Sequence, residues 1–222
     1  MERGRHRRRG SLGRATLDWG MKARVGLAVV LAVVLAGTAT ATVLVSRDRN
    51  GGSALAGSRP PGGEALPAFR LQDQHGNIVD SRALAGRAVL VTFLDSQCRD
   101  ACPIVALQVS EALSLLGPDE RAQVIAIAIS TDPTGDTPAS ARSFLRRQRA
   151  DAELRYLLGN EAELRPVWGK FQILSSFDSG DDELHSVPVR LFDREGVWRS
   201  TLHVGSDLTP ETLAHDLRAL LE

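Results

Sequence analysis

The sequence predicts an α/β domain, with a central mixed β-sheet flanked by helices, preceded by an N-terminal transmembrane helix. Two apolar, β-branched runs at residues 88–94 and 124–129 are typical of strands buried on both faces. Segments with helical spacing follow each run, which favours parallel strands joined by helices. Ahead of them lies Val25–Val45, an uncharged stretch of 21 residues, which is long enough for a helix to cross a bilayer.

The N-terminal segment, residues 1–24, is a basic head. It carries eight arginines and lysines against two acidic residues, although the whole chain has 27 of each sign. Basic residues just before an apolar segment stay in the cytoplasm, so we expect residues 25–45 to anchor the chain with everything after them outside. A cleaved signal peptide is the alternative, but its apolar region is usually shorter. The basic head is thus interpreted as a topology signal, and no nucleic-acid partner is expected.

A change in composition separates the anchor from the folded domain. Residues 46–66 are rich in Gly, Ser, Pro and Arg, which predicts a flexible linker followed by a domain at residues 67–222. At the start of that domain, Phe69–Leu71 and Ile78–Val79 flank turn-forming side chains and predict a short hairpin.

The remaining elements follow in alternation. After the strand at 88–94, we expect helices at Cys98–Leu116 and from Thr137–Pro138 to Arg149, on either side of the strand at 124–129. The later elements are a strand at Leu154–Leu158, a helix at Glu161–Trp168 that ends at Gly169, a hairpin of residues 187–192 and 197–204, and a last helix through Leu221. A closing hairpin followed by a helix is the order found in thioredoxin folds.

The chain has two cysteines, Cys98 and Cys102, just past the strand at 88–94. This is where a strand–helix unit presents its reactive groups. Cysteines four residues apart share one face of a helical turn, and free N–H groups at a helix start favour the thiolate form. A stabilising disulfide is the simpler interpretation, but its short loop would contribute little. Three residues separate the cysteines, whereas thioredoxin-type oxidoreductases have two. This wider spacing suits a soft ion such as Cu(I), and an imidazole can complete a three-coordinate site.

Five histidines could supply that imidazole. His6 belongs to the head, while His75, His203 and His215 have the context of turn, strand and surface-helix residues. His185 precedes the strand at 187–192, and in a thioredoxin-like sheet this loop lies beside the cysteines. Position alone leaves its role open, because a lone histidine is more often an ordinary side chain than a ligand.

Taken together, these motifs resemble the Sco/SenC family of thioredoxin-like copper proteins. The resemblance spans about residues 66–216 and rests on segments in the family's order: Phe69–Gly76, Cys98-x-x-x-Cys102-Pro103, Ile129–Pro138, His185-Ser186 and Asp193-x-x-Gly196. It implies that one copper is bound by Cys98, Cys102 and His185. It also implies that the partner is the copper-binding subunit of cytochrome c oxidase.

The match has departures. Arg99 stands where the family often has proline, and Leu94–Gln97 replaces an aromatic-threonine pattern. Leu184 precedes the histidine, where an acidic residue is common. In the DPxxDTP stretch we interpret Asp132 and Asp136 as mainly structural, with a supporting or docking role left open.

Two functions follow from these residues. A membrane-anchored copper metallochaperone would use Cys98, Cys102 and His185 to help build the binuclear copper centre of cytochrome c oxidase. A thiol–disulfide oxidoreductase would use Cys98 to attack a disulfide of the oxidase or of another exported protein, and Cys102 to resolve the mixed disulfide. A thiol peroxidase fits the CxxxCP element poorly.

Overall fold

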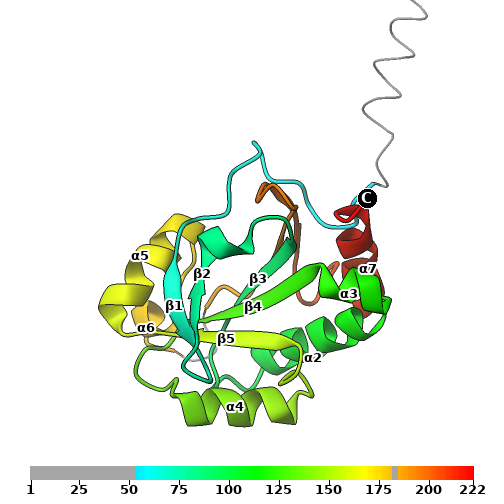
Figure 1. Ribbon diagram of the computed structural model, residues 1–222. Helices are drawn as coiled ribbons and strands as arrows, with labels where there is room; N and C mark the ends of the chain where they lie inside the picture. Colours follow the sequence, from blue (N-terminus) through cyan, green and yellow to red (C-terminus); the bar gives the residue numbers. More distant parts are fainter. Residues whose placement is uncertain (1–53, 182–184) are drawn as a thin grey trace, which may run out of the picture. The chain divides into compact units, whose positions relative to one another are not determined.

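The computed structural model describes residues 54–181 and 185–222, which form a seven-stranded mixed sheet between two helical layers (Figure 1). The strands are β1 (Arg70–Asp73), β2 (Ile78–Asp80), β3 (Ala88–Leu94), β4 (Val124–Ser130), β5 (Leu154–Leu158), β6 (Val189–Phe192) and β7 (Trp198–Leu202). The helices are η1 (Ser81–Leu84), α2 (Ala101–Ser114), α3 (Pro118–Ala122), α4 (Pro138–Arg147), α5 (Glu161–Phe171), α6 (Ser176–Ser179) and α7 (Pro210–Ala219).

The sheet has the order β2-β1-β5-β4-β3-β6-β7. Its centre is parallel: β3 pairs with β4 in register from Ala88↔Val124 to Leu94↔Ser130, and β4 pairs with β5. The outer pairs are antiparallel, including the closing hairpin of β6 and β7. The predicted mixed sheet is therefore confirmed.

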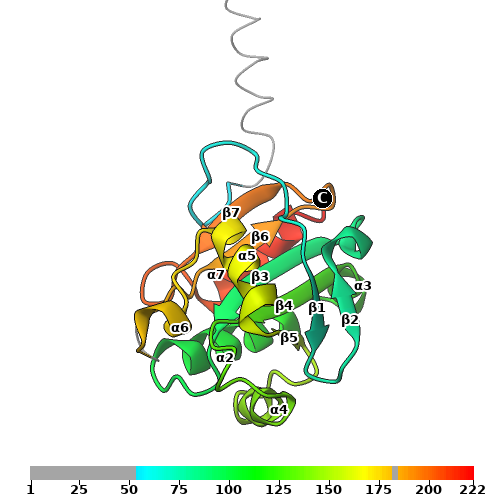
Figure 2. The ribbon, with the colours of Figure 1, turned by 90° about the vertical axis from the view of Figure 1, so that its left-hand side faces the viewer.

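Both faces of the sheet are covered, because successive side chains of β3 enter different cores. Leu90 and Leu94 pack in the core formed with α2, α4 and α7. Val91 and Phe93 pack in a second core with α5. Figure 2 shows α5 on one side of the sheet and α2 and α7 on the other. Burial of every residue of β3 and β4 explains why the two runs read as apolar.

The helix limits follow local chemistry. The Thr137 side chain accepts a hydrogen bond from the Ser140 backbone N–H, and Pro138 occupies the first turn of α4, as expected. Two limits differ from the prediction. Helix α2 begins at Ala101, three residues after Cys98, and α5 continues through Gly169 to Phe171, where Gln172 ends it in a left-handed conformation with φ of 52°.

The predicted linker needs a correction for residues 54–66, which we call the N-terminal strap. The strap packs on the domain instead of tethering it freely. The backbone N–H groups of Ala56 and Gly57 donate to the buried carboxylate of Asp216 in α7 at 2.7 and 3.1 Å, and Ser200 Oγ donates to it at 2.7 Å. A Cβ atom on Gly57 would overlap Ser200 Oγ, so this close approach requires glycine.

The predicted basic head (1–24), anchor (25–45) and first part of the linker lie outside the described residues. Within residues 54–181 and 185–222, no helix combines the length and apolar character needed to cross a bilayer.

Candidate metal centre

The two cysteines lie where strand β3 leads into helix α2. Cys98 is in the connecting loop, and Cys102 is in the first turn of the helix. Both side chains are buried, with exposures of 5% for Cys98 and 0% for Cys102, and both are free thiols. They are therefore close to the surface without being open to solvent, with Cys98 the more accessible of the two.

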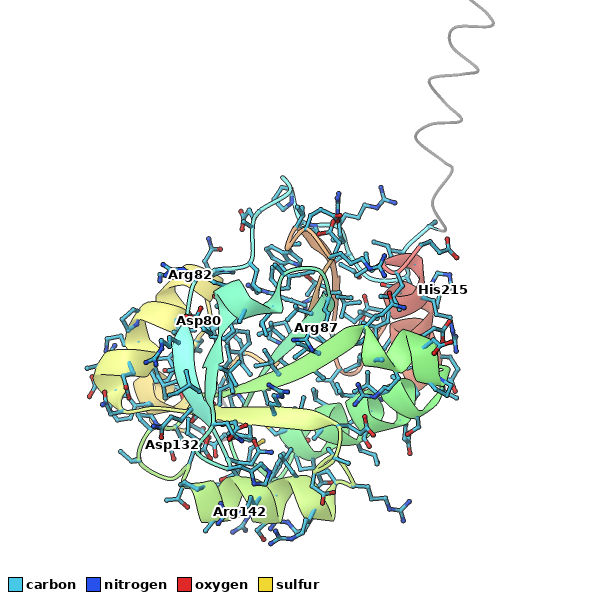
Figure 3. The ribbon with its side chains drawn as sticks, viewed as in Figure 1. Asp80, Arg82, Arg87, Asp132, Arg142 and His215 are labelled. Atoms are coloured by element: carbon cyan, nitrogen blue, oxygen red, sulfur yellow. The ribbon has the colours of Figure 1, made fainter. Side chains whose placement is uncertain are left out.

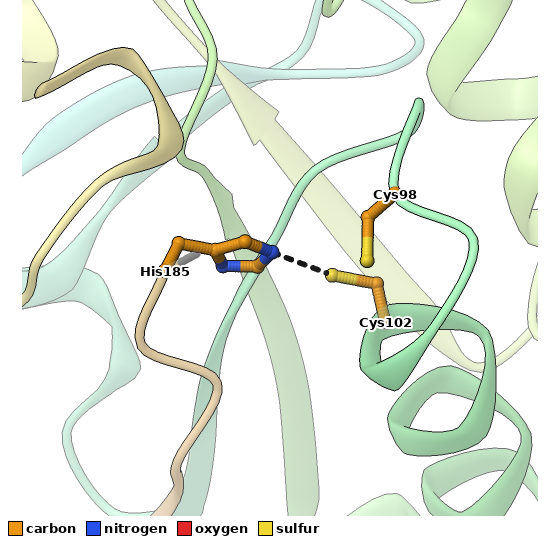
Figure 4. Close-up of side chains that lie close together, drawn as sticks. All are labelled: Cys98, Cys102 and His185. Carbon is orange, nitrogen blue, oxygen red and sulfur yellow. Dashed lines mark hydrogen bonds between the residues drawn. The ribbon is translucent and has the colours of Figure 1, made fainter. Parts of the chain in front are cut away.

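His185 completes a cluster with these cysteines. Its Nε2 atom lies 3.2 Å from Cys102 Sγ, and Figure 4 shows the imidazole directed at the two sulfurs. The ligand atoms of the three residues all lie within 4.8 Å of one another. This is the single such group of three or more potential ligands found in the described residues. The structure thus brings together the three residues that the resemblance implied, with His185 lying 83 positions after Cys102 in the sequence.

A neighbouring serine fixes the loop that carries His185. The Ser186 backbone N–H donates to Leu174 O at 2.9 Å, and Ser186 Oγ accepts from the Leu174 N–H at 3.1 Å. This two-way contact holds the loop to the segment after α5. The His-Ser pair therefore has a local reason: the serine secures the loop whose histidine faces the sulfurs.

The two thiols differ in their electrostatic surroundings. A hydrogen bond from Cys102 lowers the pKa of Cys98 to about 3, with help from His185 and from backbone N–H groups at the start of α2. Burial raises the pKa of Cys102 far above its usual range, and the neighbouring Cys98 raises it further. The cluster at neutral pH is therefore a thiolate at Cys98 and a thiol at Cys102.

The imidazole responds to the same thiolate. Burial acts to lower the pKa of His185, but the hydrogen bond and charge of Cys98 outweigh it and raise the pKa above 6.5. A soft cation bound by the two sulfurs and Nε2 would replace the hydrogen bonds among these three side chains.

The other histidines stay apart from the cluster. His75 is exposed between β1 and β2, and His203 is exposed just after β7, outside the strand in which we expected it. His215 is exposed on α7, as Figure 3 shows. His6 and Leu184 lie outside the described residues.

Sequence patterns alone did not single out Asp95 and Tyr156. Asp95 follows β3 and is completely buried, and its backbone N–H donates to Cys102 Sγ at 3.4 Å. Tyr156, in β5, is also completely buried, and its hydroxyl contacts Leu94 O and the Asp136 carboxylate. An acidic residue directly after an apolar strand was the one available signal for Asp95; Tyr156 had none.

The sequence of this chain matches those of a known protein family. The SCO1/SenC family model matches residues 59–222. The chain belongs to the SCO1/SenC family. An SCO2-like protein of Rickettsia conorii is 28% identical over 156 residues, which cover 68% of this chain and 74% of that protein.

Solved structures of Sco proteins agree with the fold. Copper-bound ScoI of Bradyrhizobium japonicum is 32% identical, with a TM-score of 0.59 over 70% of this chain and 98% of that one. BsSco, a member of the Sco family of cytochrome c oxidase assembly proteins with an identified disulfide switch, has a TM-score of 0.61 at 21% identity, over 73% and 96% of the two chains. The thioredoxin-like Sco fold is therefore confirmed, and a Sco relative holds copper.

Proposed function

We propose that this protein is a membrane-anchored copper metallochaperone that works outside the cytoplasm and helps to assemble the binuclear copper centre of cytochrome c oxidase. The observation that carries the proposal is the cluster of Cys98, Cys102 and His185. The chain's membership in the SCO1/SenC family and the copper-bound ScoI of Bradyrhizobium japonicum support the choice of metal. The apolar stretch at residues 25–45 and the basic residues before it support the anchor and its orientation.

The donor set suits copper in its reduced form. Two sulfurs and one imidazole are soft to intermediate ligands that together favour Cu(I) over hard cations. The thiolate of Cys98 supplies one negative charge before the ion arrives, whereas Cys102 must release its proton on binding. Burial of both sulfurs limits the access of water to the ion.

A copper chaperone must also release its cargo. The site lies at one end of the sheet, on two loops and the first turn of a helix, and two of its three ligands come from loop residues. An acceptor thiol that reaches this end can exchange ligands with Cys98 first, because that sulfur is the more exposed. An anchor would confine donor and acceptor to one membrane and raise their effective concentration.

A thiol–disulfide oxidoreductase is the second candidate, favoured by the unequal thiols. A thiolate at Cys98 next to a protonated, buried Cys102 is the arrangement of an attacking and a resolving cysteine. In this role the protein would reduce cysteines of the oxidase or of another exported partner. Both roles require reduced cysteines, so His185 distinguishes them.

The test is complementation of a strain that lacks this gene. We expect Cys98→Ser and Cys102→Ser to abolish copper loading of the oxidase, and His185→Ala to abolish it too. Normal loading with His185→Ala would favour the oxidoreductase. Normal loading with Cys102→Ser would refute both candidates. A chain without residues 1–45, carrying a cleavable signal peptide, tests whether anchoring is required.

A further inference from the structure

A buried carboxylate joins the copper loop to the sheet. Asp136 lies in the connection between β4 and α4 and is buried. Its Oδ1 atom accepts from the Ser96 backbone N–H at 2.9 Å. Its Oδ2 atom accepts from Ser130 Oγ at 2.6 Å and from the Tyr156 hydroxyl at 2.7 Å. Since Ser96 is two residues before Cys98, one carboxylate links β4 and β5 to the loop that presents the first sulfur.

The side chain of Ser96 makes further contacts. Its Oγ atom donates to Ser140 Oγ in the first turn of α4 at 3.0 Å, and the Gln97 side chain donates to it from within the loop. Both contacts join one side chain to another. The hydrogen bond to Asp136 fixes the Ser96 backbone. With the bond from the Gln97 backbone N–H to Asp95 Oδ1 at 2.7 Å, it sets the direction in which the chain enters Cys98.

The carboxylate charge is unfavourable for the fold itself. Burial raises the pKa of Asp136 to about 6, although hydrogen bonds from Ser130, Ser96 and Tyr156 act against this shift. Those contacts are hydroxyl and amide groups, which a neutral amide could also satisfy. A buried charge that a neutral isostere could replace points to a use outside stability.

We propose that Asp136 is a positioning residue for the copper and thiol cluster, whose ionised carboxylate holds the Ser96 backbone and so sets Cys98 against Cys102 and His185. Protonation of Asp136 weakens this hold. The inference rests on the proposed function in that it concerns the same cluster. It assigns a role to the DPxxDTP stretch that the copper ligands leave unexplained.

The network can accept the proton without breaking. The Tyr156 hydroxyl lies 2.7 Å from Asp136 Oδ2 and 2.9 Å from Leu94 O, and its single proton can serve only one of them. When Asp136 is ionised, the tyrosine donates to the carboxylate. When Asp136 is protonated, its new O–H donates to the tyrosine oxygen, and the tyrosine proton turns to Leu94 O. The carboxyl then offers Ser96 a neutral acceptor in place of a charged one, which weakens that bond.

Other titratable groups surround this network and must be separated from Asp136. Burial raises the pKa of Tyr156 well above 10, so this phenol stays neutral. The charged or titratable groups of the neighbouring segments are Asp95, Cys98, Cys102, Asp132, Arg142 and His185. Cys98 raises the pKa of His185 above 6.5, and both residues are present in wild type and variant alike. The difference between two pH profiles therefore isolates Asp136.

The experiment compares wild type with Asp136→Asn in the full-length chain in detergent. Cu(I) affinity is measured by competition with bicinchoninate, and the alkylation rate of Cys98 in the metal-free protein by mass spectrometry, each at about pH 5 and about pH 7.5. At the higher pH we expect the variant to bind Cu(I) about tenfold more weakly. At the lower pH we expect the two proteins to match, because wild-type Asp136 is then protonated. The alkylation rates should converge in the same way.

Two further variants sharpen the result. Asp132→Asn is the matched control, because its carboxylate bonds within its own loop to Thr134 and Gly135; Figure 3 labels Asp132. We expect this control to follow wild type at both pH values. Tyr156→Phe removes one donor but keeps the carboxylate, so the pH midpoint of the transition should move upward.

Three outcomes would overturn the inference. The profiles of wild type and Asp136→Asn could run parallel, the control could lose as much affinity as Asp136→Asn, or Asp136→Asn could lower the melting temperature enough to account for the weaker binding. Each leaves the proposed function standing if wild type binds Cu(I). If wild type binds none, the proposed function fails, and the alkylation rates still decide the role of Asp136.

Discussion

The N-terminal strap and the Cys98 loop are two irregular segments attached to the same sheet in the same way. Each is held by a buried aspartate that accepts hydrogen bonds from its backbone. Asp216 accepts from Ala56 and Gly57, and Asp136 accepts from Ser96. Each carboxylate also accepts a hydrogen bond from a serine hydroxyl of a strand. Ser200 Oγ in β7 donates to Asp216, and Ser130 Oγ at the end of β4 donates to Asp136.

The consequences differ because the segments carry different residues. The strap carries no copper ligand, so its attachment contributes to the stability of the domain. The Cys98 loop carries the more accessible sulfur, so its attachment sets the geometry of the site. Similar hydrogen bonding thus serves stability in one place and function in another. Variants of Asp216 should therefore change stability, and variants of Asp136 should change Cu(I) affinity.

The largest effect should come from a copper ligand itself. We expect Cys102→Ser to reduce Cu(I) affinity by at least about 1,000-fold, or about 4 kcal/mol, because a hard hydroxyl replaces a soft sulfur. Its melting temperature should stay near that of wild type, since the side chains are similar in size. Competition with bicinchoninate gives the affinity. Retained binding would mean that copper sits elsewhere.

Removing the α7 aspartate that holds the strap should act on stability alone. Asp216→Ala leaves the N–H groups of Ala56 and Gly57 and the Ser200 hydroxyl without their acceptor, at a cost of about 3 kcal/mol. Urea unfolding measures this loss. Cu(I) affinity should be unchanged, and a parallel fall in affinity would end the separation between the two regions.

Loss of the imidazole should weaken copper binding less than loss of a sulfur. We expect His185→Ala to lower Cu(I) affinity on the order of 100-fold, or about 2.8 kcal/mol, since two sulfurs remain. His203→Ala is the matched control, because His203 is exposed and outside the cluster. Equal affinities of the two variants would exclude His185 as a ligand.

The smallest effect concerns the stability contributed by Asp136 as pH changes. Its pKa is about 6 in the fold, against 3.8 ordinarily, so the folded state binds the proton more tightly. The resulting stability is fully present below about pH 4 and is lost as pH rises through about 6. Asp136→Asn should remove this slope and be at least as stable as wild type at neutral pH. Chemical unfolding across this range measures it; a variant less stable at neutral pH would assign the carboxylate to the fold.

The sequence predicted the parts of the site that leave a local pattern. The buried strand, the helix start and the cysteine spacing placed Cys98 and Cys102 at the right end of the sheet. His185 required the family resemblance, because no local pattern connects it with a cysteine 83 positions away. Its contact with Cys102 arises from the order of strands in the sheet.

The prediction of a free linker failed because backbone groups make the contacts there. The strap has the composition of a linker, yet the N–H groups of Ala56 and Gly57 meet a carboxylate 160 and 159 positions away. Such bonds depend on no side chain of the strap, so composition cannot reveal them. Asp136 posed the converse problem. DPxxDTP is also an ordinary turn and helix start, and the buried contacts of Asp136 with Ser96 and Tyr156 distinguish it.

The central claim is that Cys98, Cys102 and His185 form one copper site. The most direct measurement is X-ray absorption at the copper edge of the reduced full-length chain loaded with Cu(I). We expect one copper per chain with two sulfur neighbours and one nitrogen neighbour, and loss of the nitrogen in His185→Ala. A site with sulfur neighbours alone in wild type, or a nitrogen that persists in His185→Ala, would contradict it.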